Sequence, residues 1–196
     1  MEKTNDGWEI TPENDLEKSI LASEIFKIAA RFGNQRKGHP EGMLGVHIQQ
    51  ILDYINMQNW QEFRPDLRVL AMLHDLGKPK VVYSEKGHVV GKGHSEYSEE
   101  IAREFISDER LLRLIRIHDK YFHFYSDESR GRFKEDKFRG IYQPLDLETL
   151  TRFNYADSNN REKDSIVWFE DTCYRLGLRD TRIYLMEPGV LEYGPN

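Results

Sequence analysis

Cysteine is nearly absent from this sequence of 196 residues, because Cys173 is the only one. A single cysteine excludes a disulfide framework and a zinc site built from thiolates, and it suits a reducing compartment. No apolar run approaches the roughly 18 residues of a membrane-spanning helix. The segment Met1–Asp6 is polar and has no apolar signal-peptide region. We therefore expect a cytoplasmic protein that does not contact a membrane.

An excess of positive charge is also missing. The chain has 28 Lys and Arg against 34 Asp and Glu, which gives a net charge of −6 with its seven His neutral. Proteins that bind nucleic acid duplexes or anionic lipids without specificity usually have a basic surface. Nucleic acid is therefore an unexpected partner, although a local basic patch would be compatible with this charge.

Apolar residues recur mainly at helical spacing along the chain. We expect an all-α fold, a bundle of six to seven helices with one small β-hairpin. In this scheme residues 1–13 form a flexible arm, residues 14–180 form a single domain, and residues 181–196 form an irregular tail or a short strand.

The first half of the chain gives three helix predictions. The first helix should begin near Asp15 and end at Gly33, with one apolar stripe facing inward. The stripe consists of Leu21, Ile25, Ile28 and Phe32. A second helix is expected over residues 43–57. A third should start at Pro65 and is apolar nearly all round over residues 67–73, which predicts a buried helix.

A β-hairpin and four more helices are predicted after this point. The short apolar runs 81–83 and 88–90 flank the turn residues 84–87, which is typical of a hairpin. The further helices are expected at residues 96–106, after a cap at Ser107 or Asp108, from Asp146, and over residues 163–176. The charged stretch 126–144 contains Gly and Pro, and we expect it to be a long loop.

Histidine and aspartate residues interrupt the buried stripes of four predicted helices. These inward residues are His47, His74, Asp75, His118 and Asp157. A single inward His is usually a core residue with a satisfied ring, but an unpaired buried carboxylate is very costly. A shared metal ion accounts for all five residues at once. Imidazole and carboxylate suit Mn, Fe, Co, Ni or Zn, and carboxylate with water also suits Mg.

The order of these residues resembles a known family signature. His47, then Leu-His-Asp-Leu-Gly-Lys at residues 73–78, then Asp157 is similar to the HD-domain metal-dependent phosphohydrolase superfamily. Gly93-His94-Ser95 and Ile117-His118 resemble two further histidines of its dinuclear members. The likeness covers about residues 40–165 and looks most like the HD domains of tRNA nucleotidyltransferases. The chain has no room for their catalytic head domain, so we expect no polymerising activity.

This resemblance implies a role for each matching residue. The implied ligands are His47, His74, Asp75 and Asp157 for a first metal, and Asp75, His94 and His118 for a second. Asp75 would bridge the two ions, and Lys78 would bind and neutralise substrate phosphate. Both residues are counted as catalytic. The implied cofactors are divalent metals, two per chain, chosen from Mn, Fe, Co, Ni, Mg or Zn. The implied reaction is hydrolysis of a nucleotide-like phosphate ester by a metal-bound hydroxide.

Several residues outside the ligand set also bear on function. Arg130 and Arg132 follow an aromatic run, and such a segment can stack a base and hold a phosphate, although a solvated loop is equally compatible with the pattern. Lys78 also suits the end of a helix on dipole grounds alone. We expect His39 and His88 to be surface residues.

Two other functions stay open at this stage. Some HD-fold proteins use the same six ligands for a diiron centre that activates dioxygen, and the motif does not separate them from the hydrolases. A non-catalytic binding module, in which the metal only orders the fold, is the third class. A full ligand set argues against that module, because a purely structural site has no need of open positions.

Overall fold

The computed structural model describes residues 7–35, 42–158, 164–181, 183–187 and 190–193, and this part of the chain is mostly helical. Its ten α-helices are α1 (Asp15–Ala22), α2 (Glu24–Ala30), α3 (Leu44–Met57), α4 (Arg64–Leu73), α5 (His94–Ala102), α6 (Glu109–Ile117), α7 (Lys120–Glu128), α8 (Glu135–Ile141), α9 (Pro144–Asp157) and α10 (Asp164–Arg175). Its short elements are the 3-10 helix η1 (Lys78–Lys80) and the strands β1 (Val82–Tyr83), β2 (Val89–Val90), β3 (Ile183–Glu187) and β4 (Val190–Tyr193). The predicted all-α class is confirmed, with more helices than expected. Among the described residues, no helix has both the length and the apolar character needed to cross a membrane.

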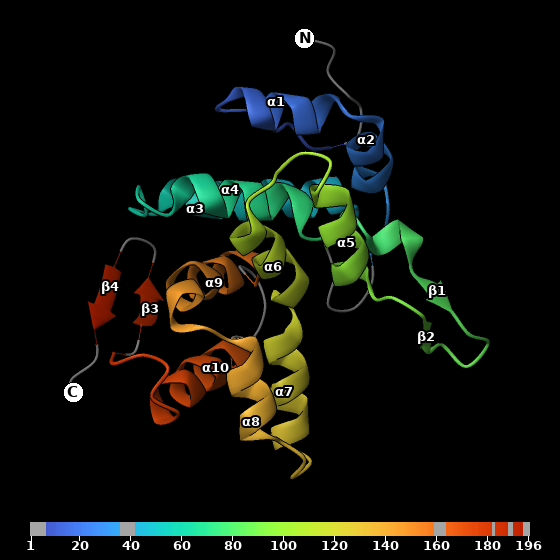
Figure 1. Ribbon diagram of the computed structural model, residues 1–196. Coiled ribbons are helices and arrows are strands. Elements are labelled where there is room, and N and C mark those ends of the chain that lie inside the picture. Colours follow the sequence, from blue (N-terminus) through green and yellow to red (C-terminus); the bar gives the residue numbers. More distant parts are fainter. Residues whose placement is uncertain (1–6, 36–41, 159–163, 182, 188–189, 194–196) are drawn as a thin grey trace.

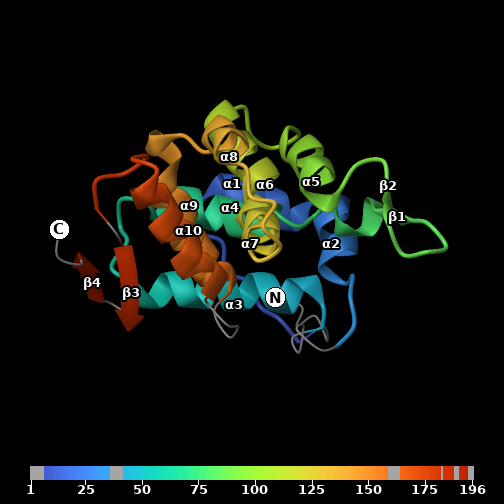
Figure 2. The ribbon, with the colours of Figure 1, turned by 90° about the horizontal axis from the view of Figure 1, so that it is seen from below.

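Helix α4 lies at the centre of the fold (Figure 1, Figure 2). It packs against α1, α3, α5, α6 and α9, and every residue from Leu67 to Leu73 is buried. Pro65 lies in its first turn, where the missing N–H has no helical partner to lose. The prediction of a helix buried all round is confirmed. His74 and Asp75 follow directly at its C-terminal end, so they leave the helix inside the protein.

The predicted first helix is two helices, because the chain breaks at Ser23. This residue has extended backbone angles (φ −69°, ψ 143°), and its side chain accepts a hydrogen bond from the N–H of Phe26, which caps α2. The break changes which residues face inward. Ile28 and Phe32 are 65 % and 44 % exposed, whereas Phe26 and Ala30 are fully buried. The predicted apolar stripe is therefore wrong at Ile28 and Phe32, whereas Ile25 is partly buried against the core.

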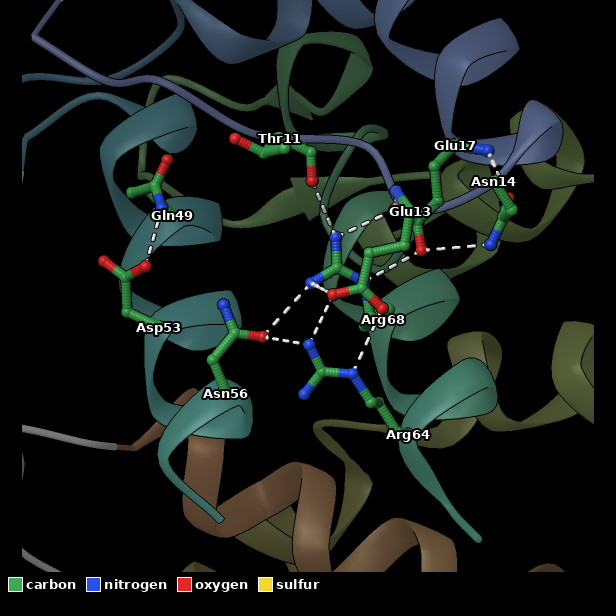
Figure 3. Close-up of polar contacts among 9 residues, drawn as sticks. All are labelled: Thr11, Glu13, Asn14, Glu17, Gln49, Asp53, Asn56, Arg64 and Arg68. Carbon is green, nitrogen blue, oxygen red and sulfur yellow. Dashed lines mark hydrogen bonds and ion pairs between the residues drawn. The ribbon is translucent and has the colours of Figure 1, made fainter. Parts of the chain in front are cut away.

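The described part of the expected N-terminal arm, residues 7–13, is fastened to the body although it is neither helix nor strand. The ring of Trp8 packs edge-on against an aromatic ring of α2. The buried guanidinium of Arg68 donates to Thr11 O at 3.0 Å and to both carboxylate oxygens of Glu17 at 2.8 Å (Figure 3). This network ties the N-terminal segment and α1 to the central helix.

The stretch 126–144 is not the predicted loop. Helix α7 continues to Glu128, and α8 occupies residues 135–141. Most charged side chains of α8 are exposed, but Phe138 is fully buried. Its ring centroid lies 5.2 Å from that of Phe124 and 5.8 Å from that of Phe169. A single inward aromatic residue fixes this short helix, and the surrounding charges hide it from a periodicity analysis.

The predicted hairpin after α4 is confirmed, and a second pair of strands is present near the C-terminus. Strands β1 and β2 are antiparallel and project from the helical body (Figure 1). Their paired residues are Val82 with Val90 and Tyr83 with Val89, all of them exposed. Strands β3 and β4 also pair antiparallel, within residues 181–196, where we expected an irregular tail or a short strand.

Candidate metal centre

The six residues that the sequence predicts as ligands come together from five elements of the fold. They are His47 in α3, His74 at the C-cap of α4, Asp75 directly after it, His94 at the first position of α5, His118 at the C-cap of α6, and Asp157 at the last position of α9. All except His47 lie at or next to a helix end. Because α3, α5, α6 and α9 all pack on α4, these ends meet beside its C-terminus.

The first group of ligand atoms surrounds His74. Its Nε2 lies 3.1 Å from Asp75 Oδ2 and 3.7 Å from Asp157 Oδ1. His47 Nε2 lies 2.8 Å from the same oxygen of Asp157. One ligand atom each from His47, His74 and Asp75 lie within 4.8 Å of one another, and all three side chains are buried. This spacing is compatible with a single cation between them.

The second group shares Asp75 with the first. Asp75 Oδ1 lies 3.4 Å from His94 Nε2 and 3.8 Å from His118 Nε2. Ligand atoms of these three residues are again within 4.8 Å of one another. The two oxygens of Asp75 therefore face different groups, since Oδ2 is the oxygen near His74. A carboxylate placed in this way can bridge two cations.

Backbone carbonyl groups fix the ring orientation of two histidines. His74 Nδ1 lies 3.1 Å from Ala71 O, and His118 Nδ1 lies 2.7 Å from Ile115 O. A carbonyl oxygen only accepts hydrogen bonds, so the proton of each neutral ring must be on Nδ1. Nε2 then presents its lone pair toward Asp75, which is the arrangement that metal-binding histidines usually have.

Two buried atoms of the cluster show that a cation fits it. His74 Nε2 and Asp75 Oδ1 are buried and have no hydrogen-bond partner among the described residues. The 3.1 Å contact between His74 and Asp75 joins two acceptors when the ring is neutral with its proton on Nδ1. Two acceptors that face each other need a positive charge between them. Nitrogen and carboxylate ligands together suit a divalent transition metal.

The carboxylates of the cluster are held in their ionised form. Burial acts to raise the pKa of Asp75, but in the absence of a metal ion the positive charge of a protonated His74 and of Lys78 outweighs it and holds the pKa well below its usual range. Beside a neutral His74, a metal ion would supply this positive charge. Burial likewise opposes ionisation of Asp157, and the hydrogen bond and charge of His47 again lower the pKa. Ionised carboxylates are the form that binds a metal ion.

A glycine brings α5, and with it His94, against the end of α4. The N–H of Gly77 donates to Ser98 Oγ at 2.9 Å. A Cβ atom at position 77 would lie only 2.2 Å from His94 O and 2.5 Å from Ser98 N. Only a residue without a side chain permits this approach. Helix α5 then starts beside the cluster, and Glu96 accepts a hydrogen bond from the N–H of Gly93 at this end.

Lys78 lies at the cluster, whereas the two predicted arginines do not. Lys78 Nζ is 2.5 Å from Asp75 Oδ2, and the lysine side chain is 26 % exposed. Arg130 and Arg132 follow the far end of α7 (Figure 1). The nine residues of that helix, about 13 Å along its axis, separate them from His118. Arg132 pairs there with a carboxylate of α7 at 3.4 Å.

Two further histidines, His39 and His88, were expected at the surface. His88, between β1 and β2, is exposed, which confirms the expectation. His39 lies outside the described residues.

Two side chains beside the cluster were missed by the sequence analysis. Asp119 Oδ2 lies 3.6 Å from His94 Nε2. Lys120 Nζ lies 3.6 Å from Glu96 Oε1, and its side chain is partly exposed. A signal for Asp119 was present, because it directly follows His118 and repeats the His-Asp order of residues 74–75.

Comparison with known proteins gives one match. A family model described as the HD domain matches residues 14–146 of the chain. This range includes every residue of the cluster except Asp157. No curated protein and no solved structure gives a significant match.

Proposed function

Because the chain belongs to the HD-domain family, which its match over residues 14–146 shows, we propose that it is a metal-dependent phosphohydrolase for a small, nucleotide-like phosphate ester. The family is one of metal-dependent hydrolases. The observation that carries the proposal is the position of Asp75, whose two oxygens face two groups of ligand atoms. Phosphoryl-transfer enzymes use a pair of ions in such an arrangement.

We assign two divalent ions to the cluster. The proposed ligands are His47, His74, Asp75 and Asp157 for the first ion, and Asp75, His94 and His118 for the second. When bound, the ions would polarise a phosphoryl oxygen and lower the pKa of a water molecule.

Other groups of the protein would orient the metal ligands and stabilise the charge of the substrate. Carbonyl groups orient His74 and His118, so that these rings need not reorganise when they bind an ion. Lys78 brings an ammonium group to the partly exposed edge of the cluster, where it would stabilise negative charge on the phosphoryl oxygens. Lys120 adds a second partly exposed ammonium group at the start of α7.

A small substrate suits the charge of the chain better than a nucleic acid does. The net charge of −6 repels a polyanion, whose binding needs many phosphate contacts with Lys and Arg. A single nucleotide carries only a few charges, which two divalent ions and Lys78 can offset. We therefore propose phosphomonoesters, nucleotides and cyclic nucleotides as the substrates to test first.

The test is a hydrolysis screen with controlled metal content. Protein stripped by a chelator is reloaded separately with Mn²⁺, Mg²⁺, Zn²⁺ or Fe²⁺ and incubated with each substrate class, and the products are quantified. We expect turnover only with metal and none in Asp75→Asn. The control Asp136→Asn makes the same chemical change at an exposed position of α8 and should retain full activity.

A substitution of Lys78 distinguishes a role in substrate binding from a role in metal binding. Lys78→Ala should keep the metal content of the wild type and lower kcat/KM, because the lysine is assigned to phosphate. Loss of metal from this variant would contradict that role. No hydrolysis with any metal, together with substrate-dependent uptake of dioxygen by the iron-loaded protein, would refute the phosphohydrolase proposal as a whole.

A further inference from the structure

We propose that Asp119 is a fourth protein ligand of the second metal position, in addition to Asp75, His94 and His118. The inference rests on the proposed function, because it assumes that a second ion binds. It concerns a residue outside the set that the sequence pattern supplied.

Two carboxylates lie near the same imidazole nitrogen. His94 Nε2 is 3.4 Å from Asp75 Oδ1 and 3.6 Å from Asp119 Oδ2. Asp75 follows α4 and Asp119 precedes α7, so the two carboxylates reach His94 from different elements. One ring nitrogen carries at most one proton and can satisfy only one of the two oxygens. A cation beside Nε2 would compensate both.

The ordinary structural roles of an aspartate are not fulfilled at position 119. Asp119 is the N-cap residue of α7, yet its side chain makes no capping hydrogen bond, which is the usual reason for Asp at this place. Its Oδ1 is buried and has no hydrogen-bond partner among the described residues. The remaining ion pair, with His123 Nε2 at 3.8 Å, involves an imidazole that is 70 % exposed and is therefore weak.

With Asp119 the two metal positions have the same kinds of ligand. Apart from the shared Asp75, the first has two histidines and Asp157. The second would have two histidines and Asp119. A second carboxylate also balances the charge of a divalent ion and favours oxygen-preferring metals such as Mn²⁺.

The experiment measures metal binding directly and does not depend on turnover. Metal-free wild type and Asp119→Asn are titrated calorimetrically with Mn²⁺, and the bound metal is counted by mass spectrometry after dialysis. Wild type should bind two ions. Asp119→Asn should bind the first with unchanged affinity and the second at least about tenfold more weakly, because loss of even an outer-shell partner costs about 10–100-fold.

Matched variants keep the result interpretable. Asp136→Asn, the exposed control of α8, should bind both ions like the wild type. Asp119→Glu keeps a carboxylate and should recover part of the second affinity. Circular dichroism checks the fold of each variant, and Asp119→Ser replaces Asp119→Asn if the latter does not fold.

Three outcomes would overturn the assignment. They are wild-type affinity for both ions in Asp119→Asn, equal weakening of both ions, and a wild type that binds one ion regardless of Asp119. The hydrolysis screen separates this failure from that of the proposed function. Wild-type turnover combined with unchanged Mn²⁺ binding in Asp119→Asn refutes only the role of Asp119. A wild type that binds no metal and hydrolyses nothing refutes both.

Discussion

Removal of divalent metal should destabilise the whole fold, because the predicted ions compensate buried groups that otherwise lack partners. His74 Nε2 and Asp75 Oδ1 are buried without hydrogen-bond partners in the described part of the chain. Each such group costs about 1–3 kcal/mol, so the metal-free cluster opposes folding by about 2–6 kcal/mol in total. Binding linkage gives a similar figure, since one ion at about 100 times its Kd adds about 2.7 kcal/mol.

The effect is large enough to be measured by thermal unfolding. For a chain of this size, 1 kcal/mol moves Tm by about 2–4 °C, so one ion should raise Tm by about 5–11 °C. The assay is differential scanning calorimetry of stripped protein and of the same protein with excess Mn²⁺. Asp75→Asn removes the bridging carboxylate and should abolish the shift. Asp136→Asn should keep it.

An unchanged melting temperature would refute a stabilising role for the metal ion. If protein shown by mass spectrometry to be metal-free melts at the same temperature as protein shown to contain metal, the cluster has no need of a cation. The contacts among His74, Asp75 and Asp157 would then be satisfied in another way.

Three further substitutions test the packing that supports the site. Arg68→Met should lower the free energy of unfolding in urea by about 3–5 kcal/mol, because it leaves the buried carboxylate of Glu17 without its cationic partner. The double variant Arg68→Met/Glu17→Met should recover most of this loss, and a further loss of stability would contradict the pairing. Gly77→Ala should lower the free energy of unfolding by about 1–3 kcal/mol, because its Cβ would meet the backbone of α5. The control Gly140→Ala, whose Cβ meets nothing within 4 Å, should not lower it. Equal effects of the two substitutions would refute the close approach of α5 to Gly77. Tyr142→Phe should stabilise by about 1 kcal/mol, since the buried hydroxyl has no hydrogen-bond partner among the described residues. Burial also raises the pKa of Tyr142 well above its usual range, so wild-type stability should fall as the pH rises above about 10, where the unfolded tyrosine releases its proton and the folded one retains it. Tyr142→Phe should lack this part of the loss of stability at alkaline pH. Identical plots of stability against pH for wild type and Tyr142→Phe would contradict the raised pKa of Tyr142.

The sequence predicted five of the six cluster residues because they belong to periodic apolar segments, whereas His94 was expected only from the family resemblance. Helices α3 and α4 lie close to their expected positions. Within them the apolar spacing places His47 on a buried face, and it also places His74 and Asp75 at a buried helix end. The carboxylate of Asp75 was informative because burial of an unpaired charge is too costly to occur without a partner.

The features that the sequence analysis missed depend on single residues rather than on a repeated pattern. A hydrogen bond from Ser23 divides the first helix, and one buried aromatic residue, Phe138, fixes α8 among exposed charges. Neither changes the average periodicity of its segment. Asp119 was missed because its approach to His94 depends on where the first residue of α5 and the residue before α7 lie in space, which the spacing within either helix does not show.

The burial of α4 also explains how the short segment that follows it, residues 75–78, can contact both an ion in the interior and a substrate that arrives from solvent. Asp75 is almost fully buried, whereas Lys78, three residues later, is already 26 % exposed. Within these few residues the chain passes from the core to the surface. In the proposed reaction an anionic substrate would meet the ammonium group of Lys78 at the surface before it approached the carboxylates. This order suits a site rich in negative charge, because a cation at its entrance lowers the electrostatic barrier to a phosphate.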